Sequence, residues 1–289
     1  MNQIKTAIQL YSLKKALTKD FLGTIDKVAE IGYKNVSMYF ESPYLARFDV
    51  PCEANVLKAK LDGLGLKMIN THVVYHPFLN WDEVIKYNQE IGSGGITIPS
   101  YLFNRDINHT KPEEAHALCK WLNEFGRKCK ENGLRLSYHN YFNEFEIFDG
   151  KYIYDILLEN TNPDYVGFEL DVYWAWRGGL DPVAALEKVG KRCEFLEVID
   201  LRADAKNVNL VEVDGAFDNA FFPKLHTHYG DYIEIGTGVL DYPAIFAKAK
   251  QIGSVQYAVS AQIEAGAKGE YQSAKENFAA IEKLIKEVE

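Results

Sequence analysis

Three residues combine the side-chain types of a metal centre, one imidazole and two carboxylates. They are His139, Asp171 and Glu197, and each lies at or near the end of a short apolar, β-forming run. A mixed nitrogen and oxygen donor set suits Mn, Zn, Co or Fe better than Mg or Ca. Each also has a simpler interpretation, because a lone histidine commonly hydrogen-bonds a loop carbonyl and Asp171 could cap its own loop through the amides of Trp174 or Arg177. Their occurrence on three consecutive predicted strands favours a divalent metal ion, with Mn, Zn, Co or Mg as candidates.

The elements that would position this set form eight alternating strand and helix patterns. Apolar, β-branched runs predict strands over Thr6–Ser12, Asn35–Phe40, Lys67–Val74, Gly95–Pro99, Leu134–His139, Val166–Asp171, Phe195–Leu201 and Gln256–Ala261. Amphipathic patterns with end signals predict helices over Asp20–Ile31, Glu53–Leu64, Trp81–Ile91, Pro112–Asn132, Tyr152–Glu159, Pro182–Val189, Pro243–Gln251 and Ser273–Glu287. Eight such units without a linker predict an α/β fold, a single-domain (β/α)8 TIM barrel over residues 1–289, with a doubly wound open sheet as the alternative.

In such a barrel the active site collects at the carboxyl ends of the strands. These ends carry further polar residues, namely Gln9, Tyr11, Ser37, His72, Asn140, Asp200, Ser260 and Gln262. The stretch Arg202–Thr237 is longer than an ordinary loop and is predicted to lie over or beside the site. We expect His72 and His139 to line the same site as Asp171 and Glu197. If these two carboxylates share an ion, they must lie within roughly 8 Å of each other.

Composition narrows the classes of partner. With 289 residues, of which 47% are hydrophobic and 25% charged, the chain is typical of a globular protein with a sizeable core. A net charge of −9, without a cluster of Lys or Arg, argues against nucleic acid as a partner. No apolar stretch reaches the roughly 18 residues of a membrane span, and no signal-peptide pattern precedes the first strand. The 4 cysteines lack a Cys-x-x-Cys spacing, so we expect reduced thiols and a cytoplasmic location.

Several short motifs resemble those of the sugar phosphate isomerase/epimerase family, which has the xylose isomerase-like barrel. They are Ile8-Gln-Leu-Tyr-Ser12, Gly32-Tyr-Lys-Asn-Val36, His72-Val, Tyr138-His-Asn140, Glu144-Phe145, Phe168-Glu-Leu-Asp-Val-Tyr-Trp174, Gly178-Gly-Leu-Asp-Pro182 and Gly236-Thr-Gly-Val-Leu-Asp241. The resemblance covers nearly the whole chain and implies a (β/α)8 barrel that holds one divalent metal and binds a sugar or sugar phosphate. It also implies an isomerase or epimerase, in which the metal stabilises an enediolate while a carboxylate moves the adjacent proton.

The chain also departs from the pattern of the family. Ser37 stands where the second strand usually carries Glu, and Tyr141 replaces the second His of the fifth-strand motif. On the seventh strand Glu197 takes the place of a His, whereas Asp200 is kept. On the eighth strand Ser260 stands where Glu is usual. The metal site implied by the resemblance is therefore incomplete, because its fourth ligand is missing.

From the shared motifs and the departures together, we predict roles for individual residues. Glu144 is the first candidate for the catalytic base, although a surface position after the strand explains it equally well. Glu197 is the second candidate, and it is also predicted to be a metal ligand together with His139 and Asp171. The substrate-binding residues are predicted to be His72, Asn140, Trp174 and Gln262.

The primary prediction is therefore a metal-dependent isomerase or epimerase of a sugar, sugar phosphate or sugar derivative, with its oligomeric state left open. One alternative is a barrel that has lost its metal and acts as a sugar-binding or regulatory protein, which the serine at position 260 favours. Another is a lyase or hydrolase that acts on keto-sugars on the same fold. The metal content of the purified protein discriminates the first alternative from the other two.

Overall fold

Eight parallel strands form a closed barrel at the centre of the protein. The computed structural model describes residues 3–40, 50–99, 112–205, 231–262 and 268–289. The barrel strands are β1 (Lys5–Gln9), β2 (Asn35–Phe40), β3 (Lys67–Val73), β4 (Gly95–Pro99), β5 (Arg135–His139), β8 (Val166–Asp171), β9 (Cys193–Val198) and β12 (Tyr257–Ser260). β1 pairs in parallel with β12, which closes the sheet and confirms the predicted barrel over the open alternative.

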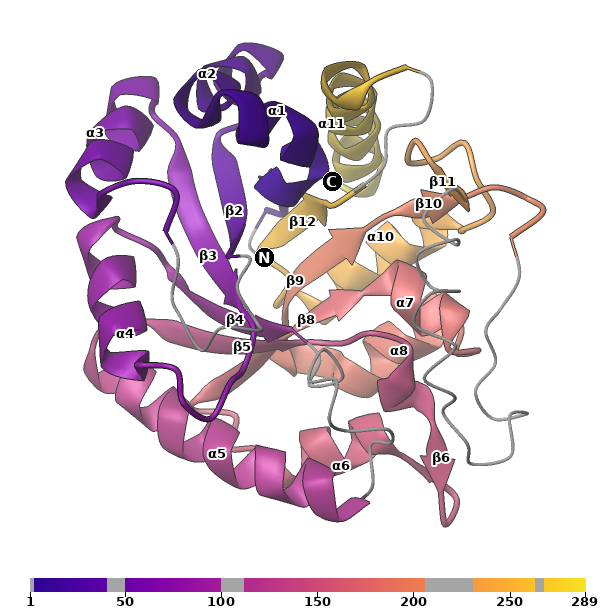
Figure 1. Cartoon of the computed structure of the whole chain (residues 1–289). Coiled ribbons are helices and arrows are strands. Elements are labelled where there is room, and N and C mark those ends of the chain that lie inside the picture. The colour runs from indigo at the N-terminus through magenta and orange to yellow at the C-terminus, as the bar shows by residue number, and fades with distance from the viewer. Residues whose placement is uncertain (1–2, 41–49, 100–111, 206–230, 263–267) are drawn as a thin grey trace.

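A ring of helices surrounds the barrel (Figure 1). The helices that follow the eight strands are α2 (Phe21–Ile31), α3 (Ala54–Leu64), α4 (Trp81–Glu90), α5 (Pro112–Glu131), α6 (Ile153–Asn160), α8 (Pro182–Val189), α10 (Tyr242–Ile252) and α11 (Glu270–Val288). Several begin at a side-chain cap: Asp20, Asn80, Asp181 and Asp241 each accept a hydrogen bond from a backbone amide of the first turn. Such caps satisfy amides that have no partner within the helix, which fixes where each helix begins.

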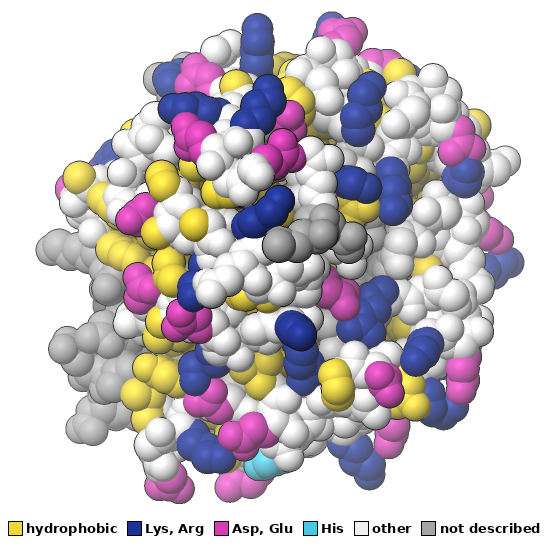
Figure 2. Space-filling model, turned by 180° about the vertical axis from the view of Figure 1, so that it is seen from behind, with side chains coloured by type: hydrophobic (Ala, Val, Ile, Leu, Met, Phe, Trp, Pro, Cys, Tyr) yellow, Lys and Arg dark blue, Asp and Glu magenta, His cyan; other side chains and the backbone are white. Residues whose placement is uncertain are grey.

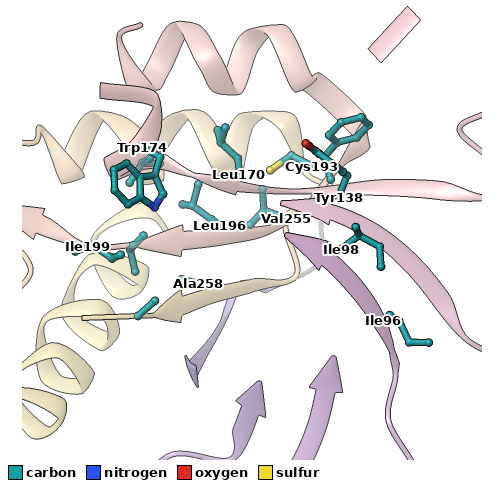
Figure 3. Packing of buried hydrophobic residues seen from close by; sticks show 14 of the residues in the cluster. Ile96, Ile98, Tyr138, Leu170, Trp174, Cys193, Leu196, Ile199, Val255 and Ala258 are labelled. Atoms are coloured by element: carbon teal, nitrogen blue, oxygen red, sulfur yellow. The ribbon is translucent and has the colours of Figure 1, made fainter. Parts of the chain in front are cut away.

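The strand residues alternate between two environments. Outward-facing side chains such as Phe168 and Leu170 pack against the helices in a large apolar layer, part of which Figure 3 shows. A smaller cluster formed by Ala7, Ile69, Phe195, Tyr257 and Val259 is separate from this layer. On β8 the outward-facing residues alternate with Glu169 and Asp171, so the period of two directs both carboxylates into the barrel.

Several short elements were not predicted from the sequence. The first strand ends at Gln9 and is followed by a 3-10 turn over Leu10–Leu13 and by α1 (Lys14–Lys19). A six-residue helix, α7 (Val172–Arg177), occupies part of the predicted loop after β8. A two-stranded hairpin of β6 (Ile147–Phe148) and β7 (Lys151–Tyr152) follows β5. Each is too short to carry a periodic pattern, which explains why the sequence signal was missing.

The seventh predicted strand is divided in two. β9 ends at Val198, and β10 (Asp200–Leu201) leaves the barrel to pair antiparallel with β11 (Tyr232–Ile233). This pair brings together the two ends of the predicted long loop. Residues 206–230 of that loop lie outside the described residues, so its position over the site stays a prediction.

Asp200 anchors the segment that returns from this loop. Its carboxylate accepts hydrogen bonds from the amides of Gly236, Gly238, Leu201 and Leu240 at 2.9–3.3 Å, and the residue is fully buried. A Cβ atom on Gly238 would lie 2.2 Å from Asp200 Oδ1, so this close approach requires glycine. Asp200, which the chain shares with the family pattern, is therefore explained by its role in holding the backbone from Gly236 to Leu240.

We predict that Asp200→Ala destabilises the protein by about 2 kcal/mol or more, because it leaves four backbone amides without their acceptor, two of them in the buried residues Leu201 and Leu240. Denaturant unfolding followed by circular dichroism measures this. The control is Asp204→Ala, which removes an exposed ion pair with Arg202 and should leave the free energy of unfolding close to that of wild type. Equal stability of Asp200→Ala and wild type would contradict the anchoring role.

Basic and acidic side chains are interspersed on the face shown in Figure 2, without a patch of one sign. None of the helices within the described ranges is long and apolar enough to cross a membrane.

Candidate metal centre and active site

His139, Asp171 and Glu197 come together at the carboxyl end of the barrel. Asp171 lies beside Glu197 in the register of β8 and β9, and His139 ends the neighbouring strand β5. His139 Nε2 lies 3.6 Å from Asp171 Oδ2 and 3.4 Å from Glu197 Oε2. One ligand atom of each residue lies within 4.8 Å of the others, well inside the predicted limit for the two carboxylates. We call these three residues the metal group.

The facing atoms of the metal group have no hydrogen-bond partner within the described part of the chain. These atoms are His139 Nε2, Asp171 Oδ2 and Glu197 Oε2, all inaccessible to solvent. Leaving a buried polar atom unpaired costs about 1–3 kcal/mol, and more for a charged one. A divalent cation would satisfy all three atoms at once, and imidazole with two carboxylates is a donor set that such ions accept. The residues present therefore fit a divalent metal.

The charge of each residue in the metal group depends on its neighbours. Burial raises the pKa of Glu197 to about 8, an effect that His139 only partly offsets. Burial alone would lower the pKa of His139, but the negative charges of Glu197 and Asp171 outweigh it and raise that pKa well above its ordinary value. Without a divalent cation, a positive charge on His139 therefore offsets the buried negative charge of the metal group.

Asp171 is held in place from two sides. Its Oδ1 accepts a hydrogen bond from the Trp174 amide at 2.9 Å and caps α7. The Asn140 side chain donates to the Asp171 carbonyl at 3.2 Å and accepts from the Asp171 amide at 3.1 Å. The two sequence-based interpretations of Asp171 are therefore compatible, because one carboxylate oxygen caps the helix and the other faces the metal group.

A second cluster adjoins the metal group and shares Glu197 with it. His72, Glu169 and Glu197 also place one ligand atom each within 4.8 Å of one another. Glu169 Oε2 accepts from His72 Nε2 at 3.0 Å, Asn70 Nδ2 at 2.8 Å and Thr97 Oγ1 at 3.0 Å. Burial opposes ionisation of Glu169, yet the neighbouring His72 and the other donors lower its pKa to about 2. Its second oxygen, Oε1, is buried and accepts no hydrogen bond from any described residue.

Sequence reasoning missed Glu169. The signal was present, because Glu169 precedes Asp171 by two residues and alternate residues of a strand share a face. His72, predicted as a substrate-binding residue, lies next to Glu169 and within 5.3 Å of the His139 ring, measured between ring centroids.

Glu144, the first candidate for the base, is buried, and both of its oxygens accept hydrogen bonds. Tyr138 donates its hydroxyl to Oε1 at 2.6 Å, and the Tyr141 amide donates to Oε2 at 2.9 Å. Glu144 belongs to neither of the two clusters around Glu197. Its contacts instead hold the chain that follows β5, which carries Asn140 and Tyr141.

We predict that Glu144→Gln destabilises the protein by about 1–3 kcal/mol and leaves Mn²⁺ affinity within about twofold of wild type. The amide must place its NH₂ group against one of the two donors, so one charge-assisted hydrogen bond is lost. Denaturant unfolding and calorimetric titration measure the two quantities. A fully stable variant that has lost proton transfer would restore Glu144 as the base.

The remaining predicted residues lie at different places around the site. Trp174 packs its ring 5.3 Å from that of Tyr141, measured between centroids, and Tyr141 contacts the His139 ring. Gln262 Oε1 accepts a hydrogen bond from Asn277 of α11. Ser260 is buried and interacts with the Tyr33 hydroxyl, which also donates to a carbonyl of α11. Neither residue at the end of β12 belongs to the metal group.

The fold and this site define a class of protein, the (β/α)8 barrels with a buried histidine–carboxylate cluster at the carboxyl ends of the strands. Within that class the family model for the xylose isomerase-like TIM barrel matches residues 25–284. The chain belongs to this family, whose members include carbohydrate-modifying enzymes.

Individual relatives are consistent with this family. An inosose dehydratase of Geobacillus kaustophilus (strain HTA426) is 29% identical over 145 residues, which are 50% of this chain and 44% of that protein. The match thus spans less than half the length of the relative. A sugar phosphate isomerase/epimerase of Parabacteroides distasonis has 23% identity and a TM-score of 0.74, over 96% of this chain and 93% of the other. The IolI protein, solved with a bound zinc atom, has 12% identity and a TM-score of 0.73 over 99% of both chains. These two structures show the fold.

Proposed function

We propose that this protein is a divalent-metal-dependent enzyme that moves a proton next to the carbonyl group of a sugar or sugar derivative, as an isomerase or epimerase. The observation that carries the proposal is the set of facing, buried and unpaired atoms of His139, Asp171 and Glu197. A barrel that had lost its metal would be free to replace such a set by apolar or paired groups, since each unpaired atom lowers stability. The retained set therefore supports a metal-binding enzyme over the metal-free alternative.

His139, Asp171 and Glu197 would hold the ion. When bound, it would supply positive charge that polarises the substrate carbonyl and offsets the negative charge developing on oxygen. Asn140 and the amide of Trp174 orient Asp171 for this role through the hydrogen bonds described above. The rings of Tyr141 and Trp174 lie beside His139 and would limit access of water to the reacting atoms.

We assign the proton transfer to Glu169. Its Oε2 is held by three donors, which keep the carboxylate ionised and fixed in position. Its Oε1 has no donor among the described residues and can take the proton from the carbon next to the carbonyl. The reacting carbon of the substrate would therefore lie beside Glu169 Oε1, next to the metal group with which the second cluster shares Glu197.

Proton exchange tests the proposal directly. The Mn²⁺-loaded protein is incubated in D₂O with a panel of ketohexoses, their 6-phosphates and inososes, and deuterium at the carbon next to the carbonyl is followed by NMR. We expect incorporation into at least one compound, and none with Asp171→Asn. A protein that binds Mn²⁺ but exchanges no proton in any compound would contradict the enzyme, and one that binds no Mn²⁺ would support the metal-free alternative.

Dehydration is a second candidate function, favoured by one structural observation and one relative. Among the described barrel strands, Asp and Glu residues that face the interior come from β8 and β9, whereas β1, β2 and β12 carry none. One carboxylate can take the proton from carbon and deliver it to a departing hydroxyl, which leaves as water while the C=C bond forms. The match to an inosose dehydratase agrees with this chemistry. Mass spectrometry of the products separates the candidates, because only dehydration loses one water.

A further inference from the structure

We infer that neutral side chains beside the carboxylate clusters bind the hydroxyl groups of an unphosphorylated keto-sugar or keto-cyclitol. The residues are Gln9, Ser37 and Asn70, which we call the amide wall. The inference rests on the proposed function and specifies its substrate class. Neither the metal group nor the proposed proton transfer uses Gln9 or Ser37.

The amide wall is continuous across three strands. Gln9 of β1 lies opposite Ser37 of β2, and Ser37 lies opposite Asn70 of β3 in the register of the sheet. Gln9 Nε2 donates to Ser37 Oγ at 3.0 Å. Asn70 Nδ2 donates both to Thr97 Oγ1 at 2.7 Å and to Glu169 Oε2 at 2.8 Å. The wall therefore begins at the carboxylate assigned to proton transfer and extends away from it around the barrel.

Two acceptors of this wall have no donor within the described part of the chain. Gln9 Oε1 and Asn70 Oδ1 are both buried and unpaired, in residues that are 4% and 1% exposed. The orientation of the Asn70 amide is fixed, because only its NH₂ group can donate to the Glu169 carboxylate. The unpaired atom of Asn70 is therefore an acceptor. A sugar hydroxyl can donate to such an atom, whereas a phosphate dianion has no hydrogen to donate.

The charge of the barrel interior gives a second reason to expect a ligand without a phosphate group. Arg177 is the sole Lys or Arg among the buried residues that the structure describes, and its guanidinium is engaged by Asp231 and the Tyr173 hydroxyl. A phosphate placed beside the amide wall would add negative charge near the interior carboxyl groups of Glu169, Asp171 and Glu197, and no buried Lys or Arg other than Arg177 lies among the described residues to offset it.

Calorimetric titration tests the inference on the Mn²⁺-loaded protein. The ligands are a panel of neutral ketohexoses and inososes and the 6-phosphates of the same ketohexoses. We expect at least one neutral compound to bind, and each phosphate to bind at least about tenfold more weakly than its neutral parent. Gln9→Leu should weaken binding of the neutral compound roughly tenfold, because one hydrogen bond to a buried acceptor is lost.

The control is Gln89→Leu, which makes the same change at an exposed position on α4 and should leave binding unchanged. Gln9→Met repeats the loss of the amide with a more flexible side chain, and Mn²⁺ titration of each variant reports whether its metal group is intact. Tighter binding of a phosphate, binding of no neutral compound, or full affinity in both Gln9 variants would overturn the inference. Absence of Mn²⁺ binding by wild type would instead overturn the proposed function, so the two failures are distinguishable.

Discussion

Asp171→Asn is expected to weaken Mn²⁺ binding by more than about 100-fold while the protein remains folded. The substitution removes a negative charge and a ligand oxygen from a group of three, and loss of an outer-shell partner alone commonly costs 10–100-fold in metal affinity. Folding should persist because asparagine also caps helices, so the hydrogen bond from the Trp174 amide can be kept. Calorimetric titration with Mn²⁺ measures the affinity, and circular dichroism checks the fold.

Asp181→Asn is the matched control for this substitution. Asp181 caps α8 through the Ala184 amide at 2.9 Å, as Asp171 caps α7, but it is exposed and outside the metal group. We expect wild-type Mn²⁺ affinity from the control. Equal affinity in Asp171→Asn and wild type would show that the ion, if bound, is held by other residues.

Glu169→Gln is expected to lower the rate of proton exchange by about 10²–10⁴-fold with little effect on Mn²⁺ affinity, since a positioned general base contributes a factor of this size. The structure should tolerate the change. All three donors converge on Oε2, so the glutamine oxygen can occupy that position while its NH₂ group replaces Oε1, which accepts nothing. Deuterium incorporation from D₂O, measured beside a Mn²⁺ titration, separates the two effects.

Glu144→Gln serves as the buried control for Glu169→Gln, because it neutralises a glutamate that lies outside both clusters. It should retain exchange at the wild-type rate when measured under conditions in which it is folded. If exchange survives in Glu169→Gln but fails in Glu197→Gln with Mn²⁺ still bound, the base is Glu197, the second candidate from the sequence.

The architecture could be predicted because it depends on repeated local patterns. Alternating apolar periodicities give eight strands and eight helices, and a parallel barrel then brings the ends of neighbouring strands together. For this reason the sequence was sufficient to predict that Asp171 and Glu197 lie side by side. The register of β8 and β9 confirms this neighbourhood. Elements of a few residues, such as α7, carry too little periodicity to be predicted in the same way.

Roles that depend on partners distant in sequence could not be predicted. The sequence shows Glu144 after a strand but not that Tyr138 and Tyr141 take both of its oxygens. It shows Asn140 beside His139 but not that its amide holds the backbone of Asp171. The position of Glu169, by contrast, could have been predicted. It lies two residues before Asp171 on the same strand, so its side chain points to the same face of the barrel. The catalytic and substrate-binding roles of these residues stay predictions.

The most direct measurement of the central claim is the number of divalent ions bound per chain. Protein without a histidine tag is stripped with a chelator, equilibrated by dialysis against Mn²⁺ and analysed for metal. We predict about one ion per chain for wild type and almost none for Asp171→Asn. Wild-type protein that binds no ion, or a variant that binds as much as wild type, would contradict a metal centre formed by His139, Asp171 and Glu197.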